Sequence, residues 1–410
     1  NEPPYDAEVV LSKEDKEAIR RALRPLHAEP IFLEDEVRAK HEVYVNECLF
    51  PRFNNVLETG SRSAAFGDLI LDLDPYVAAF RRANQLIADA IVKGLGDHSG
   101  IDLLWLHDYQ LSLVASYVRA QCDQSESVPS MVLSLHACFP TSEVFRSLEN
   151  RDELLRGMLS ADIVNFHTFN HARHFMQSCR RVLGLRFRSR QGGHMSVDVL
   201  GRHVTTCINH MGPALDELQA AMRSERSAAV AERLRRAYAG RAVIIGFDEC
   251  QRLSGVMLKM LAFEHLLKTS RRYRNRVVLV QRCFLRDGRR KDTCTSSKEL
   301  RAIAARINTA FGFHVDYAEA NTWDLAYRVG AFHAADMLLH TPSREGVNLM
   351  PLDFVFCRAQ WSLEARSAGG GSGVARSAGS VSGSGRDDSV GGDVSPRASP
   401  TPDAVNPGLS

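Results

Sequence analysis

The chain has 410 residues, 44% of them hydrophobic and 24% charged, and a formal net charge of +2 at pH 7. These proportions are typical of globular proteins, and so small a net charge excludes the strong field of a nucleic-acid-binding or membrane-surface protein. No apolar run approaches the roughly 20 residues of a membrane span. The nine cysteines are scattered and lack C-x-x-C spacing, which argues against a zinc site and favours a reducing compartment, the cytoplasm.

The first 212 residues alternate short apolar runs with amphipathic segments. The apolar runs predict strands at residues 30–33, 102–106, 131–135 and 162–166. The amphipathic segments predict helices at residues 13–26, 34–50, 66–91 (over the second half), 111–120 and 171–183, and a helix entry at Thr141 or Ser142. Residues 191–204 predict a hairpin with Gly192–Gly193 at its turn.

A second series of alternating segments begins with a charged helix predicted over residues 215–238. Strands are predicted at residues 241–247, 277–281, 314–318 and 337–340. Helices are predicted at residues 256–268, 298–311, 322–334 and 348–358. Strands separated by helices of this length indicate parallel sheets. We therefore predict an α/β protein with two domains, residues 1–212 and 213–361, and a cleft between them.

The two ends of the chain differ in character from these domains. The chain begins at Asn1 and shows no secretory signal, so we interpret it as a piece of a longer protein or as a processed chain. Residues 362–410 are rich in Gly, Ser and Pro and nearly lack large apolar side chains. Such a segment cannot bury enough surface to offset its ordering entropy, so we predict a disordered tail.

Three predicted strands of the first domain are each followed by a histidine: His107, His136 and His167. In open α/β sheets, ligands lie outside the carboxyl ends of the strands. His136 is thus a candidate donor of a hydrogen bond to a sugar hydroxyl, and Asp108 a candidate for orienting a hydroxyl nucleophile or holding its proton. The alternatives are an ordinary loop histidine and a buried His107–Asp108 pair that supports its loop.

In the second domain, a glycine precedes the helix predicted after residues 337–340. Gly346 lets the backbone come close to a ligand, and the amides of Asn348 and Leu349 lie at a helix amino terminus, which binds anions such as a diphosphate. Asp353 follows within reach of a ribose hydroxyl. The alternative is an ordinary helix start after a loop glycine.

Four stretches follow a family pattern in order along the chain. They are LWLHDY at 104–109, LHACFPTSE at 135–143, FHTF at 166–169 with ARHF at 172–175, and TPSREGVNL at 341–349. They resemble W-V-H-D-Y-H-L, L-H-x-P-F-P-S-S-E, G-F-H-T-x-D-Y-A-R-H-F and T-P-x-R-D-G-M-N-L of the trehalose-6-phosphate synthase family, glycosyltransferase family 20. The resemblance covers residues 30–358. Residues 255–267 and 348–351 are most similar to the plant-type class II branch, where a phosphatase-like domain follows.

The resemblance implies a GT-B fold, two Rossmann-like domains with the active site between them. It implies transfer of glucose from UDP-glucose to glucose 6-phosphate with retention, without a metal or other cofactor. By motif position, the implied catalytic residues are Asp108 near the acceptor and His136 near the donor glucose. The implied donor-binding residues are Glu345, Gly346, Asn348, Leu349 and Asp353. The acceptor would also meet His41 and Phe50. Implied partners are the two substrates and, as alternatives, a phosphatase-like domain in the same longer chain or a second copy of this chain.

The chain departs from the family at the site for the donor diphosphate. The family has an Arg and a Lys in G-x-D-R-L-D-Y-x-K-G, whereas residues 246–255 are GFDECQRLSG, with Glu249 for the Arg and Ser254 for the Lys. Losing one preorganised donor typically costs about 3 kcal/mol in the transition state. Losing two exceeds about 5 kcal/mol, a factor of several thousand in rate. Arg252 would compensate in part if its side chain turned inward.

Other family positions differ as well. His41 and Phe50 stand for an aromatic Tyr and Trp, and Asn54–Asn55 for a His–Tyr pair. Glu345 replaces an Asp, and Asp353 a Glu. The resemblance also places the family's glycine loop and the end of its donor domain outside this chain.

Three hypotheses follow. The first is a UDP-glucose-dependent trehalose-6-phosphate synthase. The second is a catalytically inactive synthase-like domain that binds a sugar phosphate or a partner and regulates trehalose metabolism. The third is a scaffold without a ligand.

Overall fold

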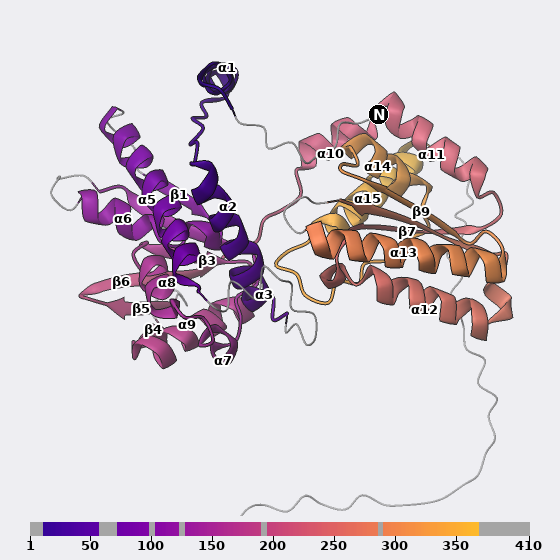
Figure 1. The fold of residues 1–410 in the computed structure, drawn as a ribbon. Helices are drawn as coiled ribbons and strands as arrows, with labels where there is room; N and C mark the ends of the chain where they lie inside the picture. Colours follow the sequence, from indigo (N-terminus) through magenta and orange to yellow (C-terminus); the bar gives the residue numbers. More distant parts are fainter. Residues whose placement is uncertain are drawn as a thin grey trace, which may run out of the picture. The chain divides into compact units, whose positions relative to one another are not determined.

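A computed structural model of the chain describes residues 11–56, 72–97, 103–122, 128–189, 195–285 and 290–368. Within them the strands form two separate sheets, one of six strands and one of four, each accompanied by helices (Figure 1). The predicted strand at 131–135 belongs to the first sheet and that at 337–340 to the second. The two predicted series of alternating elements therefore build different sheets.

The first sheet is parallel on one side and antiparallel on the other. Its strands are β1 (Leu103–His107), β2 (Ser130–Leu135), β3 (Ile163–Phe166), β4 (Phe187–Ser189), β5 (Met195–Val199) and β6 (Arg202–Ile208), in the spatial order β1-β2-β3-β6-β5-β4. β1, β2, β3 and β6 run parallel, and Leu133 pairs with Leu106 on one side and Val164 on the other. Because parallel strands end at the same edge, the loops after β1, β2 and β3 gather there.

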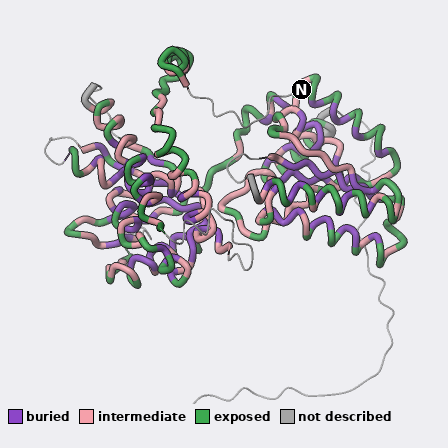
Figure 2. The backbone as a smooth tube through the Cα atoms, in the orientation of Figure 1, coloured by how far each residue is buried: buried purple, intermediate pink, exposed green. Residues whose placement is uncertain are grey.

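Seven helices pack with this sheet around one apolar core: α2 (Asp35–Val43), α3 (Phe50–Phe53), α5 (Asp74–Asp97), α6 (Val114–Cys122), α7 (Ser142–Phe145), α8 (Arg151–Met158) and α9 (Phe169–Leu183). The helix before them, α1 (Lys13–Leu23), buries no residue. A π-helical segment, Tyr44–Leu49, joins α2 to α3. Phe139 lies at the centre of an aromatic cluster, with ring centroids 5.2 Å from Phe145 and 5.4 Å from Phe175. This packing anchors the loop that follows β2. Figure 2 shows the buried strands inside the exposed outer faces of the helices.

The second sheet is wholly parallel, with the spatial order β10-β7-β8-β9. Its strands are β7 (Ala242–Glu249), β8 (Val277–Phe284), β9 (Val315–Ala320) and β10 (Met337–Leu338). The chain proceeds from β7 to β8 and β9 in one direction and then returns to the other side of β7. The order thus reverses between β7 and β10, which is where ligands bind in open α/β sheets.

Helices cover both faces of the second sheet. α10 (Leu215–Met222), α11 (Glu225–Ala237), α14 (Leu325–Ala334) and α15 (Met350–Ala368) share one apolar cluster with Val278 and Val280 of β8. α12 (Val256–Thr269) and α13 (Arg290–Phe311) share another with Val277 and Leu279. The alternation along β8 is what a strand buried on both faces requires. Val256, Met260, Phe263 and Leu267, at helical spacing in the helix predicted over 256–268, are core residues of α12.

Four predicted elements are corrected by the structure. Residues 30–33 form no strand; Pro30 has no N–H for a ladder, and Phe32 lies under Lys16 and Arg20 at 5.5 and 5.3 Å. The helix predicted over 215–238 is two helices, because the Ser224 side chain accepts from the Ser227 amide and begins α11 anew.

The other two corrections concern a turn and the tail. The predicted single hairpin is two antiparallel pairs: β4 pairs with β5 on either side of residues 190–194, which include Gly192–Gly193 and lie outside the described residues. β5 and β6 are then joined at Leu200–Gly201, where both φ angles are positive, 46° and 78°, as a tight hairpin turn demands. Residues 362–368 continue α15 rather than starting a disordered tail. The rest of the predicted tail lies outside the described residues, and the predicted boundary near Gly212, between β6 and α10, stays a prediction.

In the part of the chain that the structure describes, every helix is too short or too polar to cross a bilayer.

Two glycines offer opposite tests of the packing. A Cβ on Gly330 of α14 would lie 2.4 Å from the backbone oxygen of Ser227 in α11, whereas one on Gly94 of α5 meets nothing within 4 Å. We expect Gly330→Ala to lower the free energy of unfolding by about 1–3 kcal/mol. Gly94→Ala should raise it by about 0.5–1 kcal/mol, since alanine is the better helix former. Urea unfolding of both variants checks this, and a stabilised Gly330→Ala would show that α11 and α14 are not in close contact.

Candidate functional site

A row of three histidines follows the ends of β1, β2 and β3. Nδ1 of His107 lies 2.9 Å from Nε2 of His136, and Nδ1 of His136 lies 3.0 Å from Nε2 of His167. Adjacent rings have centroids 5.2 and 5.1 Å apart. The in-register pairing of the three strands brings these side chains together although they are about thirty residues apart in the chain.

Both ring nitrogens of His136 are occupied by the neighbouring histidines. A neutral imidazole has one donor and one acceptor nitrogen, so the row forms a chain with one direction of donation. Burial lowers the pKa of His167, which favours the neutral ring at that end. A hydrogen bond from His136 to a sugar, the predicted role, therefore requires an exchange of one of these two contacts.

Asp108 joins two of the loops at this edge. Its Oδ1 accepts from the amides of Tyr109, at 3.0 Å, and Ala137, at 3.3 Å. Its own amide donates to the Ser134 carbonyl at 2.7 Å, and its φ of 68° is left-handed, which Asp and Asn tolerate better than most residues. Burial raises the pKa of this carboxyl against the lowering effect of the amides. Asp108 thus fastens the loop after β2 to the loop after β1.

The two predicted acceptor residues on the helical segment pack in different ways. His41 stacks on Phe80 of α5, with centroids 5.6 Å apart, and burial lowers its pKa. Phe50 begins α3, and its carbonyl accepts from the amide and the side chain of Asn54. It is Phe53, not singled out from the sequence, that stacks on Tyr109 beside Asp108, at 4.6 Å.

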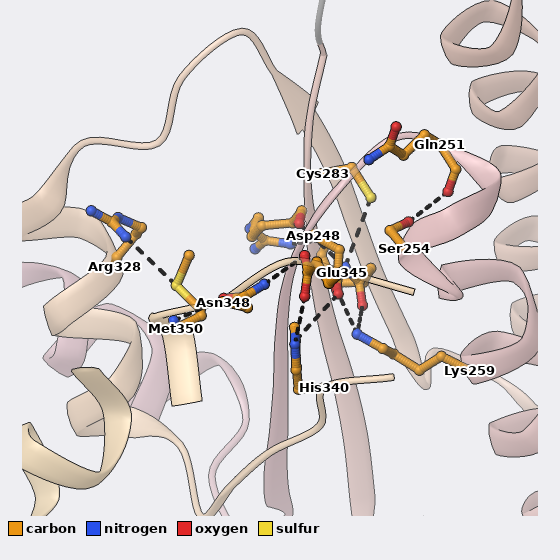
Figure 3. Close-up of polar contacts among 12 residues, drawn as sticks. Asp248, Gln251, Ser254, Lys259, Cys283, Arg328, His340, Glu345, Asn348 and Met350 are labelled. Atoms are coloured by element: carbon orange, nitrogen blue, oxygen red, sulfur yellow. Dashed lines mark hydrogen bonds and ion pairs between the residues drawn. The ribbon is translucent and has the colours of Figure 1, made fainter. Parts of the chain in front are cut away.

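Four of the five predicted donor-side residues, Glu345, Gly346, Asn348 and Leu349, lie on the loop between β10 and α15, where the strand order of the second sheet reverses. Figure 3 shows Glu345 and Asn348 of this loop. Glu345 Oε1 accepts from Asn348 Nδ2 at 2.9 Å, and Asn348 Oδ1 accepts from the Met350 amide at 2.8 Å. Asn348 therefore caps α15 and holds Glu345 at the same time. Gly346 lies between them, half-buried.

Asp353 lies one turn into α15 and is buried. Its amide donates to the carbonyl of Leu349 at 2.8 Å. Its carboxylate lies 3.8 Å from Arg328 Nη1 of α14, and burial raises its pKa although Arg328 opposes this. A carboxyl group in this position is suited to accept from a hydroxyl group at the start of α15.

The predicted diphosphate position holds a small polar cluster. Glu249 Oε2 accepts from Gln251 Nε2 at 2.7 Å. Ser254 Oγ donates to the Gln251 carbonyl at 2.6 Å (Figure 3). Ser254 is buried, 5% exposed. Both replacements thus serve the turn that follows β7.

A buried ionic network beneath this turn was not predicted. Lys259 Nζ of α12 lies 2.5 Å from Asp248 Oδ2 and 3.3 Å from Gln281 Oε1, and Gln281 Nε2 donates to the same Asp248 oxygen at 2.9 Å. The Lys259 side chain has no solvent exposure. The available signal was a lysine inside the mostly apolar helix predicted over 256–268 and an aspartate directly after the strand predicted over 241–247. Among the described residues, no cluster of three His, Cys, Asp or Glu side chains has the geometry of a metal site.

Asp108 offers a test of its fastening role. Asp108→Asn keeps the oxygen that accepts from Tyr109 and Ala137, so we expect it to unfold at pH 7 with a free energy equal to or above that of the wild type. Asp108→Ala leaves both amides unpaired and should lower this free energy by about 1–3 kcal/mol. Urea unfolding from pH 3 to pH 8 measures both.

The pH dependence has a definite sign. The folded-state pKa of Asp108 is raised, so its favourable contribution is full below the unfolded pKa, near 3.8, and is lost as the pH rises through the folded pKa. The free energy of unfolding of the wild type, relative to that of Asp108→Asn, should therefore be highest at low pH. A rise of this difference in favour of the wild type with increasing pH would contradict the burial of this carboxyl.

Comparison with known proteins identifies the family. A model of glycosyltransferase family 20 matches residues 6–370. Probable alpha,alpha-trehalose-phosphate synthase (UDP-forming) 10 of Arabidopsis thaliana is 33% identical over 284 residues, 68% of this chain and 32% of that protein. Number 9 of the same series is 30% identical over 361 residues, 86% of this chain and 40% of that protein. The chain thus spans between 32% and 40% of the length of these relatives.

Solved structures share the fold. The Candida albicans trehalose-6-phosphate phosphatase N-terminal domain has a TM-score of 0.71 at 24% identity, over 85% of this chain and 72% of that one. An alpha,alpha-trehalose-phosphate synthase (UDP-forming) from Burkholderia xenovorans, in complex with glucose-6-phosphate, has a TM-score of 0.69 at 21% identity, over 79% and 69%. The predicted GT-B type α/β fold is confirmed. Since the family model matches most of its length, the chain belongs to glycosyltransferase family 20.

Proposed function

We propose that this chain acts in trehalose biosynthesis as the synthase-type part of a protein that transfers glucose from UDP-glucose to glucose 6-phosphate, releasing UDP. The transfer involves no metal or other cofactor in this proposal. The observation that carries it is the loop from Glu345 to Asn348, hydrogen-bonded to the start of α15 where the strand order reverses. This is the position at which an open α/β sheet receives a nucleotide ligand.

The donor would lie at the amino terminus of α15. Asp353 would accept from the ribose, and Glu345 with Asn348 from the glucose. In the first sheet, His136 would meet the donor glucose and Asp108 would order the loops around the acceptor, with His41 and Phe50 on the helical side. The burial and partners described for each side chain support these roles.

The weak point of the proposed donor site is its charge. Glu249 places a negative group where a diphosphate needs positive ones, and Ser254 supplies a buried hydroxyl that is bonded within its own turn. Lys259 is the nearest lysine along α12, but its side chain is fully buried and paired with Asp248. It cannot turn to the diphosphate without leaving a buried aspartate unpaired, which costs about 3–5 kcal/mol.

This charge pattern favours a second candidate function: a catalytically inactive domain that binds a sugar phosphate or a partner and regulates trehalose metabolism. The two functions differ in one measurement. Titration of UDP-glucose and of glucose 6-phosphate by calorimetry, followed by an assay of UDP release, separates them. Turnover excludes the inactive domain, and binding of glucose 6-phosphate without UDP-glucose supports it.

The proposal includes the compartment and the partner of the protein. The nine cysteines are free, seven of them buried, as expected of a protein that works in the cytoplasm. A phosphatase-like domain in the same longer polypeptide, or a second copy of this chain, is the proposed partner.

Restoring the lost charges tests the donor site directly. We expect Glu249→Arg with Ser254→Lys to strengthen UDP-glucose binding by at least tenfold, because two charge-assisted hydrogen bonds to phosphate replace a repulsion. Calorimetric titration with UDP-glucose, in the complete polypeptide where one exists, measures the gain.

A matched control guards against a general effect of positive charge. Glu217 is exposed on α10, and Glu217→Arg makes the same change of charge as Glu249→Arg. This control should leave the affinity unchanged. If the control and the restored variant gain equally, or the restored variant gains nothing, the turn after β7 does not meet the diphosphate.

A further inference from the structure

We propose that His340 is a positioning residue: it holds the carboxylate of Glu345 for the glucose of the donor, and it is itself held by the buried Asp248–Lys259 pair. The inference rests on the proposed function, because it concerns the same donor site. It is drawn from a line of contacts that runs from the interior of the second sheet to its ligand-binding edge (Figure 3).

The inner end of this line is rigid. Lys259 and Gln281 both donate to Asp248 Oδ2, at 2.5 and 2.9 Å. The side chains of Lys259 and Asp248 are 0% and 2% exposed, so solvent does not compete for these contacts. A Cβ on Gly246 would lie 2.3 Å from Gln281 Oε1 and 2.8 Å from Lys259 Nζ, so the network also rests against the backbone of β7. Asp248 therefore has one orientation.

His340 lies between this anchor and the loop. Its Nδ1 is 3.8 Å from Asp248 Oδ1, the oxygen that faces away from Lys259, and its Nε2 is 3.2 Å from Glu345 Oε2. The His340 side chain is only 19% exposed, whereas that of Glu345 is 39% exposed. The mostly buried ring thus lies within ion-pair distance, but beyond hydrogen-bond distance, of Asp248, and its other nitrogen faces a carboxylate that is exposed to solvent.

Glu345 needs such a support for a reason visible in the sequence. The family pattern has an aspartate here, and glutamate adds a methylene group and one more rotatable bond to hold. Its two oxygens are occupied separately, Oε2 by His340 and Oε1 by Asn348 at 2.9 Å. Two fixed partners restrict the longer side chain to one position at the start of α15, which a shorter side chain reaches without help.

If His340 positions Glu345, its loss should weaken binding of the glucose part of UDP-glucose and leave binding of the nucleotide part unchanged. We expect His340→Leu to weaken binding of UDP-glucose by about tenfold, the effect of losing one hydrogen bond to a charged group, and to leave binding of UDP unchanged. His340→Gln keeps an N–H within reach of Glu345 and should restore most of the affinity. Calorimetric titrations of UDP-glucose and UDP with the complete chain measure both ligands.

A double-mutant cycle tests whether His340 acts through Glu345. Once Glu345→Gln has removed the carboxylate, a further His340→Leu should cost little affinity for UDP-glucose. His265→Leu is the matched control, since His265 is an exposed histidine of α12 in the same half of the protein, and it should change neither titration.

The outcomes separate this inference from the function on which it rests. A wild-type chain that binds no UDP-glucose overturns the proposed function and this inference with it. If the wild type binds UDP-glucose, two results overturn the role of His340 alone. One is that His340→Leu weakens binding of UDP and of UDP-glucose equally. The other is that His340→Leu has its full effect on UDP-glucose affinity even in the Glu345→Gln background. If His340→Leu does not fold, His340→Ala takes its place in the same cycle, with strict additivity as the contradicting result.

Discussion

A lysine without solvent contact is tolerated only when its hydrogen bonds are completed, and this constraint organises the second half of the protein. Lys259 reaches Asp248 and Gln281 beneath the turn after β7. Removing one partner of such a buried pair costs about 3–5 kcal/mol, so the three side chains persist or change together. Gly246 follows from them, because their atoms occupy the space of a Cβ. The carboxyl end of β7, where a ligand would lie, is therefore fixed from below.

The same network bears on the proposed diphosphate site, where Glu249 and Ser254 stand for the Arg and Lys of the family pattern. A free lysine on α12 would be the simplest substitute, but Lys259 is committed to Asp248. Ser254 and Glu249 have become parts of the turn, bonded through Gln251. The polar side chains of this turn are thus hydrogen-bonded to one another. What remains directed outward is the group of Glu345, Asn348 and the start of α15.

In the first sheet, too, the polar side chains at the carboxyl edge are bonded to groups of the protein itself. Parallel pairing of β1, β2 and β3 places His107, His136 and His167 in one hydrogen-bonded row, so each ring constrains the proton of the next. Asp108, predicted as a group that handles a proton, is turned to backbone amides and keeps two loops together. Chemistry at this edge depends on loops that are held by packing, above all by Phe139 in its aromatic cluster.

The sequence by itself determined the alternation of strands and helices, the division of the strands between two sheets and the loops that carry the candidate site. These follow from local properties: apolar runs, helical spacing, and motif letters that lie close together in the chain. It did not determine how those loops are held. Three contacts could not be predicted in this way: the row of histidines, the Lys259–Asp248 pair and the contact of His340 with Glu345. Each depends on how the elements are arranged in space and not on the local sequence pattern. Strand register and the return of β10 to the side of β7 decide such contacts, and both arise only when the elements pack.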